Sequence, residues 1–253
     1  MNKGRMSEDL KAYASEFLGT AILMIGGITA ISFSLGEQSQ LATFLPNQIL
    51  RLALAGAGFG LGVLIVVYSF LGQTSGGHLN PALTIAFWMQ EKIETKQLAP
   101  YIVCQCLGSL AGTWFVATLI PHLSSSVDYG ITSVADTITP GAAILLEALL
   151  TMTFVLMIFW MTSSQNRTRY TGLCVFIYLV IIVPLEAPLT GTSINPARSI
   201  GPAIYANNYQ DLAIYIVGPL TGAIAGTFIA RYMLNQRPKC KRVCGLPKKM
   251  LRQ

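Results

Sequence analysis

The chain has 253 residues, of which 11% are charged and 53% are hydrophobic, and its mean hydropathy is +0.55. Soluble domains usually carry about 25% charged residues, so these charges are too few to cover the surface of one or two soluble domains. The composition also excludes a disordered chain, a disulfide scaffold and a nucleic-acid binder with a basic face. A membrane protein with several spans is therefore predicted.

Apolar segments that are long enough to cross a bilayer recur along the whole chain. A helix needs about 20 apolar residues to span the hydrocarbon core. The apolar runs are continuous rather than alternating, which argues against a closed barrel. We therefore predict an all-α membrane protein with six transmembrane helices. The predicted spans are residues 13–35, 48–71, 98–120, 140–162, 170–188 and 212–233.

Basic residues lie in alternate connections between these spans. They occur in the amino-terminal segment 1–12, around Lys92 and Lys96, at Arg167 and Arg169, and in the tail 236–253. The connections at 36–47 and 121–139 contain none. The positive-inside rule then places both termini in the cytoplasm, for a protein of the plasma membrane or of a bacterial inner membrane. The basic tail is expected to attract anionic membrane lipids.

The chain repeats itself within the predicted channel domain, residues 13–235. Asn-Pro-Ala occurs at 80–82 and again at 195–197, and each half also carries a glutamate in its first span, Glu16 or Glu147. Each half, 13–120 or 140–235, contains three spans. Because three is odd, the second half must lie inverted in the membrane, with segment 121–139 joining the halves across the outer face.

Each Asn-Pro-Ala stands in an apolar stretch that is too short for a further full span. Asn is a favoured helix N-cap, and Pro at the first helical position is preorganised for a helix. A helix is therefore predicted to begin at Asn80 and another at Asn195. Non-helical backbone at membrane depth persists only where protein buries it or where it lines a water-filled path. Two re-entrant half-helices that meet near the midplane follow from this.

Four segments carry a resemblance to a known family: GGHLNPA at 76–82, TSINPARS at 192–199, SEFLGT at 15–20 and LLEALLT at 145–151. In these, the sequence resembles the aquaporin, or major intrinsic protein, family over roughly residues 10–235, as a bacterial-type channel for water or for water and small solutes. The resemblance implies a homotetramer with one pore per subunit, which passes water or small neutral solutes passively.

Pore residues can be assigned on this basis. We expect Asn80 and Asn195 to cap the half-helices with their side-chain oxygens and to keep their NH2 groups free to hold a passing water. The loops before each Asn-Pro-Ala are expected to offer carbonyls as acceptors. The resemblance places Arg198 at the outer constriction, where it repels cations and donates to solutes. His78 either lines the inner vestibule or hydrogen-bonds locally, and the sequence does not choose.

The resemblance places three further positions in the outer filter. Two of them are Val183 and Thr192, and Val183 stands where water-selective members have His. The third is Gly60 when counted without gaps, or Phe59 by the local pattern, which needs one extra residue in this helix. Gly60 makes a wide filter and Phe59 a narrower one. We favour a water channel with a broad filter that also admits small uncharged solutes such as glycerol, and the alternative is a facilitator mainly for small neutral solutes.

Three glutamates lie in spans. Glu16 and Glu147 are interpreted as acceptors for loop amides, in support of the re-entrant loops, rather than as a proton relay. Glu186, near the outer mouth, is interpreted as a solvated vestibule carboxylate, or else as a partner of Arg198 or an attractor for protonated solutes. The sequence shows no metal-ligand spacing, cofactor motif or catalytic constellation, so neither a metal, a cofactor nor an enzyme is predicted. A coupled inverted-repeat transporter and a membrane adhesion protein are the rival classes.

Overall fold

The computed structural model describes residues 3–37 and 39–234, so the predicted tail 236–253 lies outside the described residues. Six long helices cross the molecule, and each is long and apolar enough to span a membrane, as predicted. The fourth and sixth spans have the predicted bounds, whereas the first helix begins at Lys3 rather than residue 13. The bounds of the other three helices differ from prediction by one to three residues at one or both ends. The long helices are α1 (Lys3–Leu35), α3 (Gln48–Tyr68), α6 (Thr95–Leu119), α8 (Pro140–Thr162), α10 (Thr171–Thr190) and α12 (Leu212–Met233).

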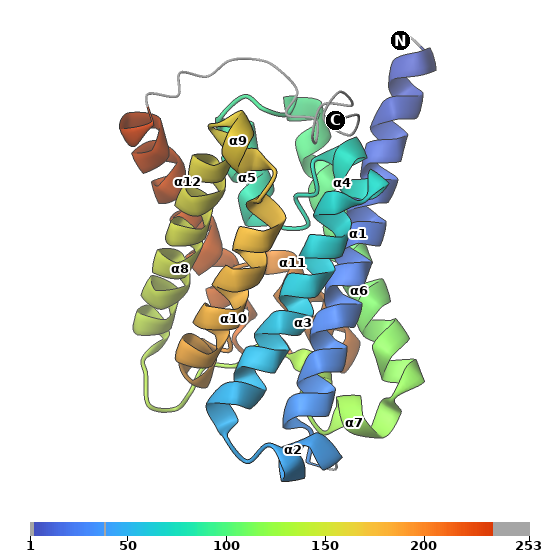
Figure 1. The fold of residues 1–253 in the computed structure, drawn as a ribbon, viewed down its shortest axis with the longest axis vertical. Coiled ribbons are helices and arrows are strands. Elements are labelled where there is room, and N and C mark those ends of the chain that lie inside the picture. The colour runs from blue at the N-terminus through green and yellow to red at the C-terminus, as the bar shows by residue number, and fades with distance from the viewer. Residues whose placement is uncertain (1–2, 38, 235–253) are drawn as a thin grey trace.

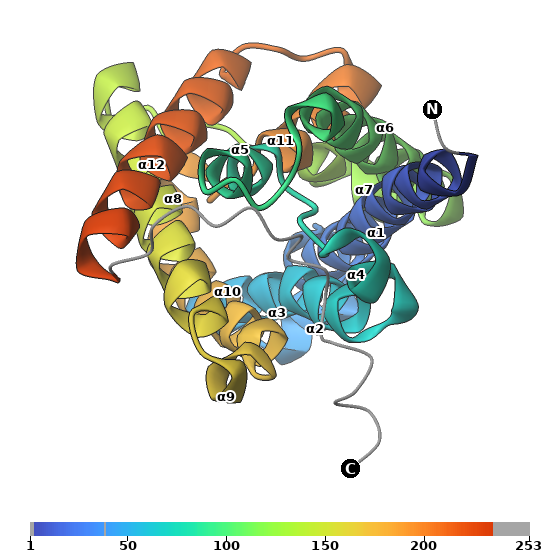
Figure 2. The same cartoon turned by 90° about the horizontal axis from the view of Figure 1, so that it is seen from above.

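Two shorter helices, α5 (Pro81–Met89) and α11 (Pro196–Ala206), lie inside the ring formed by the long ones (Figure 2). They are the predicted half-helices, and each begins directly after its asparagine. The remaining helical pieces sit at the two ends of the bundle. They are α2 (Gln40–Phe44), α4 (Phe70–Ser75), α7 (Pro121–Ser125), the 3-10 turn η1 (Asp128–Gly130) and α9 (Gln165–Thr168).

The two halves run in opposite directions through the molecule, as the repeat predicted. The helix α1 starts at the end of the bundle where the N-terminus is marked, whereas α8 starts at the opposite end (Figure 1). The helix α12 finishes at the same end as the start of α1 (Figure 1). We call this end the terminal face and the other end, which holds α2, α7 and η1, the distal face.

Each half is held by a close helix pair with a glycine at the contact. A Cβ at Gly108 of α6 would lie 2.2 Å from the carbonyl oxygen of Phe17 in α1. In the second half, a Cβ at Gly222 of α12 would lie 2.1 Å from the carbonyl oxygen of Ala148 in α8. Small residues let membrane helices approach closely enough to gain dispersion energy without a hydrophobic drive. Gly112 and Gly226, four residues further along the same helices, also contact α1 and α8 closely, so a GxxxG segment joins the paired helices in each half.

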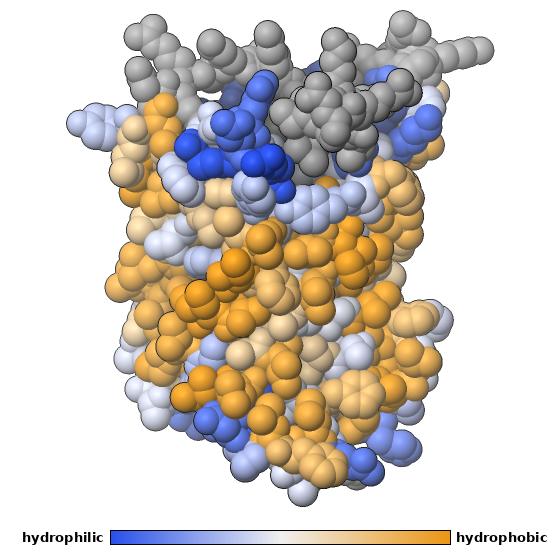
Figure 3. All heavy atoms as spheres, in the orientation of Figure 1, coloured by the Kyte–Doolittle hydropathy of each residue, from blue (hydrophilic) through white to orange (hydrophobic). Residues whose placement is uncertain are grey.

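Apolar side chains cover the middle of the molecule, and polar ones gather toward both faces (Figure 3). Large apolar residues such as Trp114, Leu145 and Phe228 are more than half exposed. Exposure of such an apolar belt to water would be unfavourable, and apolar patches of this extent are rare on soluble monomers. Together with the six apolar helices, the belt identifies a multi-pass membrane protein.

Candidate functional site: a pore between two half-helices

The half-helices begin at side-chain caps of matching geometry. The side-chain oxygen of Asn80 accepts from the amides of Ala82 (2.8 Å) and Leu83 (3.4 Å). That of Asn195 accepts from the amide of Ala197 at 3.0 Å and from the next amide along the chain at 3.4 Å. The predicted N-caps are confirmed, and they direct the positive ends of two helix dipoles into the interior.

The two asparagines also join the opposite loops. Asn80 Nδ2 donates to the carbonyl of Ile194 at 2.9 Å, and Asn195 Nδ2 donates to the carbonyl of Leu79 at 2.8 Å. The expectation that both N–H groups of each amide stay free is therefore wrong. One of them in each side chain ties the half-helices together, which leaves a single N–H per asparagine for other partners.

The loops before the half-helices adopt backbone conformations that side chains disfavour. Leu79 and Ile194 have φ of 54° and 46°, and Thr192 has φ of 51°. Positive φ is uncommon for bulky residues, and β-branched ones adopt it only when the surroundings impose it. Both loops must therefore be fixed from outside.

Two buried glutamates supply that fixing. Glu16 accepts from the amides of His78 (3.0 Å) and Leu79 (2.8 Å), and Gln105 Nε2 donates to it at 2.7 Å. Glu147 accepts from the amides of residues 193 and 194, both at 2.8 Å, and from Thr190 Oγ1 at 2.7 Å. Both side chains have no exposed surface. The geometry matches the loop-support interpretation of these glutamates, because their acceptor oxygens are occupied by loop donors.

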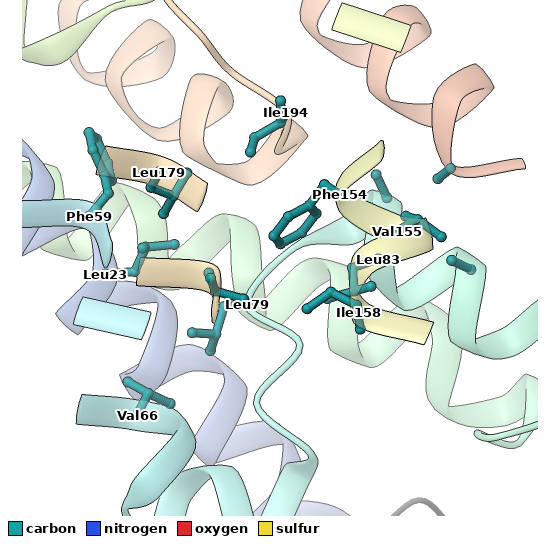
Figure 4. Close-up of a cluster of buried hydrophobic side chains, with 14 of the residues drawn as sticks. Leu23, Phe59, Val66, Leu79, Leu83, Phe154, Val155, Ile158, Leu179 and Ile194 are labelled. Carbon is teal, nitrogen blue, oxygen red and sulfur yellow. The ribbon is translucent and has the colours of Figure 1, made fainter. Parts of the chain in front are cut away.

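A cavity of about 510 Å³ runs between the half-helices and the long helices. Its lining extends from Tyr68 and Thr171 near the terminal face to Asp128 and Asn208 near the distal face. One side consists of residues 76–80 and 191–195. The facing side is apolar, and several of its side chains are labelled in Figure 4. These apolar side chains include Leu23, Phe59, Phe154, Ile158 and Leu179. A cavity with one polar side and one apolar side suits solutes that exchange hydrogen bonds with the polar side as they move along it.

Toward the distal face, the cavity lining includes Arg198, Phe59, Val183 and Thr192. The guanidinium of Arg198 lies 4.9 Å from the centre of the Phe59 ring. Gly60 is not part of this lining, because a Cβ there would meet the backbone of Phe176 in α10 at 2.9 Å. The hypothesis that Gly60 opens the filter is therefore wrong. Gly60 lets α3 and α10 pack closely, while Phe59 lines the cavity beside Arg198.

Arg198 is buried and is held in place by the distal connection. Its Nη1 donates to the carbonyl of Gly130 at 2.5 Å. This carbonyl belongs to η1, where Asp128, Tyr129 and Gly130 all have positive φ. The Tyr129 ring packs edge-on against Tyr205 at 4.9 Å, which supports the turn. Arg198 thus lines the cavity and is also tied to a loop carbonyl.

His78 lies in the loop before the first half-helix and lines the cavity. Its Nδ1 lies 3.2 Å from Thr84 Oγ1, and its ring stacks on Phe87 with 4.6 Å between the ring centres. The sequence left two interpretations open, and His78 fits both of them, since it borders the cavity and also hydrogen-bonds locally.

Glu186 is not a solvated vestibule carboxylate. It is only 5% exposed and does not line the cavity. Its carboxyl oxygens contact the hydroxyls of Thr190 and Thr192, and no ion pair with Arg198 is found among the described residues. The sequence interpretation was wrong because it placed residue 186 by its closeness to the end of a span, whereas the helix turns this side chain behind the loop.

The sequence profile of the family described as "Major intrinsic protein" matches residues 3–230. The chain belongs to this family. It is 33% identical over 227 residues to a glycerol uptake facilitator protein-like 6 from Lactiplantibacillus plantarum, an alignment that covers 88% of this chain and 98% of the relative. It is 33% identical over 235 residues to mouse aquaporin-4, covering 92% of this chain and 70% of that protein.

A further relative agrees with this assignment, and a solved structure has the same fold. Aquaporin Z from Photorhabdus laumondii is 30% identical over 241 residues, covering 90% of this chain and 99% of the relative. The X-ray structure of the aquaglyceroporin from Plasmodium falciparum superposes with a TM-score of 0.77 at 22% identity, covering 89% of this chain and 97% of the other. The structural likeness supports the fold, and the relatives support the family.

Proposed function

We propose that this protein is a passive membrane channel for water that also admits small uncharged solutes such as glycerol. The observation that carries the proposal is the cavity lined along one side by the two asparagine loops and on the other by apolar side chains. Relatives named as aquaporins and as a glycerol uptake facilitator agree with this class. A channel of this family is not an enzyme and needs no cofactor.

Selection would operate at two places. Midway, the remaining N–H of Asn80 and that of Asn195 donate to the oxygen of a passing water, so that this water donates to neither asparagine and a proton wire is interrupted. The positive ends of α5 and α11 add a barrier to hydronium and metal cations. Toward the distal face, Arg198 repels cations and offers donors to hydroxyl groups. Val183 and Phe59 are the apolar walls against which a carbon backbone can slide.

We further propose that the terminal face is cytoplasmic, because basic residues flank the spans at this end. This places both termini in the cytoplasm of a plasma or bacterial inner membrane. The family resemblance and the apolar outer walls support a homotetramer with one pore in each subunit. The basic tail would then lie against anionic lipids.

Stopped-flow light scattering of proteoliposomes tests the proposal, first with a water gradient and then with a glycerol gradient. We expect water flux above that of empty liposomes with a low activation energy, measurable glycerol flux, and no proton current when an internal pH dye is followed. Flux equal to that of empty liposomes would refute the channel. A pH change that tracks the flux would favour the coupled transporter, in which Glu16 or Glu147 relays protons.

A further inference from the structure

Glu186 is a buried carboxyl that the pore does not use directly. It lies on α10 one turn beyond Val183 and is 5% exposed. Burying a carboxyl is costly unless it is hydrogen-bonded. Support of the loop before α11 falls mainly to Glu147, which accepts the amides of residues 193 and 194, whereas Glu186 reaches only the amide of Thr192.

One carboxyl oxygen of Glu186 accepts from the hydroxyl of a residue in the cavity wall. Thr192 Oγ1 donates to Glu186 Oε2 at 2.7 Å, and Thr192 lines the cavity near Arg198. A hydroxyl has a single hydrogen, so this bond uses the only donor that Thr192 could offer to a solute. A passing solute then meets an acceptor at Thr192 and donors at Arg198.

The contacts of the other carboxyl oxygen of Glu186 indicate which of the two neighbouring carboxyl groups is protonated. Thr190 Oγ1 contacts Glu186 Oε1 and also lies 2.7 Å from Glu147 Oε1. The one hydrogen of Thr190 cannot serve two carboxylates. Glu147 accepts two backbone amides in addition, which stabilises its ionised form, whereas Glu186 has a single backbone amide, that of Thr192, besides its hydroxyl partners. The consistent arrangement is a chain in one direction, in which Thr192 donates to neutral Glu186, Glu186 to Thr190, and Thr190 to Glu147.

The first half of the molecule builds its loop without such a pair. The motif offset places Leu71 where the second half has Glu186, and Gly77 where it has Thr192. A carboxyl at this position is therefore not required to form a re-entrant loop. What it adds in the second half is an acceptor that fixes the direction of the Thr192 hydroxyl hydrogen.

We propose that Glu186, in its protonated form, is a positioning residue that sets the hydrogen-bond polarity of the outer filter through Thr192, and thereby the preference between water and small hydroxylated solutes. The inference rests on the proposed channel function. A solute such as glycerol needs acceptors for its hydroxyl hydrogens as well as donors for its oxygens, and the fixed Thr192 supplies the acceptor.

Proteoliposomes with matched variants test this through the ratio of glycerol to water permeability. Glu186→Gln keeps one donor and one acceptor, so we expect its ratio to stay within about twofold of the wild type. Glu186→Leu copies the first half and should lower the ratio about fivefold, the equivalent of one ordinary hydrogen bond. Thr192→Val should lower it similarly, and the double variant no further. Asp136→Asn, an exposed carboxylate on the distal face, is the control for loss of charge.

Infrared spectroscopy gives a second measurement that does not depend on flux. The wild type should show the carbonyl band of a protonated carboxylic acid, which Glu186→Gln removes and Thr192→Val shifts. Absence of the band, or a Gln variant as impaired as the Leu variant, would overturn the proposal. So would a folded Leu variant with an unchanged ratio, or one in which both fluxes and the thermal midpoint fall together. Wild-type flux at the empty-liposome rate would instead refute the channel itself, and this inference with it.

Discussion

Glu16 accepts the amides of His78 and Leu79 before the first half-helix, and Glu147 accepts the amides of residues 193–194 before the second. The two halves of the molecule also share contacts that involve tyrosines. A tyrosine hydroxyl in each half donates to the last carbonyl of the helix that precedes the loop, at 2.9 Å in the first half and 2.8 Å in the second. These shared contacts all hold backbone in place, which explains why both halves need them.

The halves differ where side chains face the distal part of the cavity. Arg198 stands where the motif offset gives Leu83 in the first half. The third partner of the supporting glutamate is Gln105 of α6 in the first half and Thr190 of α10 in the second. The repeated frame therefore builds a path through the membrane. Three of the proposed filter residues, Val183, Thr192 and Arg198, come from the second half, where the repeat is broken, and Phe59 comes from the first.

The largest effect is expected from removal of the shared supports. Glu147→Ala leaves two loop amides without acceptors in a buried site, at a cost of roughly 1–3 kcal/mol for each. Glu16→Ala should cost about as much, because its loop has the same geometry. Thermal unfolding in detergent and the yield of assembled protein measure both. Each Gln variant, which keeps one acceptor oxygen, should lose less. A well-folded Ala variant of either glutamate with altered proton coupling would show that the glutamates relay protons.

The next effect concerns access to the two loops from the pore. The described cysteines, Cys104, Cys106 and Cys174, lie in the long helices, and neither re-entrant loop contains one, so mercury ions should inhibit the wild type weakly. Thr192→Cys should make the channel strongly sensitive. Gly77→Cys, its counterpart in the first half, should do the same at some cost in backbone strain: a Cβ there meets only ordinary contacts, and its φ of 61° is close to the 51° that Thr192 adopts.

Water flux with and without mercuric chloride measures this sensitivity, and recovery with a thiol is the control for damage to the liposomes. Sensitivity created at Thr192 but not at Gly77 would show that only the second loop borders the conducting path. Strong block of the unmodified protein that disappears when Cys174 is replaced would mean that α10 turns another face toward the pore.

A smaller change is expected from filter width. Val183 offers no hydrogen bond in the cavity wall that also contains Arg198 and Phe59, so Val183→His adds bulk and a polar ring. Glycerol flux should fall several-fold more than water flux, because a solute with a carbon backbone pays the larger steric cost. Val175→His, on the same helix and also in the cavity wall, is the matched control. An equal fall in glycerol flux for both variants would argue against a filter at Val183.

Much of this frame could be predicted from the sequence, and the reason is physical. The long apolar segments reflect the thickness of the bilayer, and the repeated Asn-Pro pairs reflect helix capping. Both constraints act locally along the chain. The choice between Gly60 and Phe59 could not be made, because one residue of helix rotation decides which side chain faces the cavity. The crossed bonds of Asn80 and Asn195 depend on how the two halves approach each other.

The hydrogen-bond partners of Arg198 and Glu16 were also missed in the prediction from sequence. Gly130 holds Arg198 from a connection with no recognisable motif, and Gln105 supports Glu16 from α6. The signal for Gln105 was present, since an uncharged polar side chain in an apolar span needs a partner. Glu186 was misplaced because closeness in sequence to a span end says nothing of the direction in which a side chain points.

The smallest effect comes from the turns that end the half-helices. In both, a residue with positive φ is followed by one whose amide bonds back five residues, Lys92 to Phe87 at 2.9 Å and Asn208 to Ala203 at 3.0 Å. The turns are alike, but Lys92 carries a charge where the second half has a neutral side chain.

Lys92 lies outside the spanning helices, with its Nζ 4.9 Å from the ring centre of Phe159. Burial lowers its pKa from 10.5 to about 8. The folded protein therefore binds fewer protons than the unfolded chain between about pH 8 and pH 10.5, and stability rises with pH across that window. Below pH 8 the ammonium is charged in both states, and the folded state bears the full cost of burying it. Lys92→Met keeps the apolar contacts and should raise the thermal midpoint by about 2 °C at pH 7. The difference from the wild type should shrink as pH approaches 10, and Lys96→Met, an exposed lysine paired with Asp9, should show no such gain. A midpoint for Lys92→Met that is lower at pH 7 would mean that the ammonium's attraction to the aromatic rings outweighs its loss of solvation.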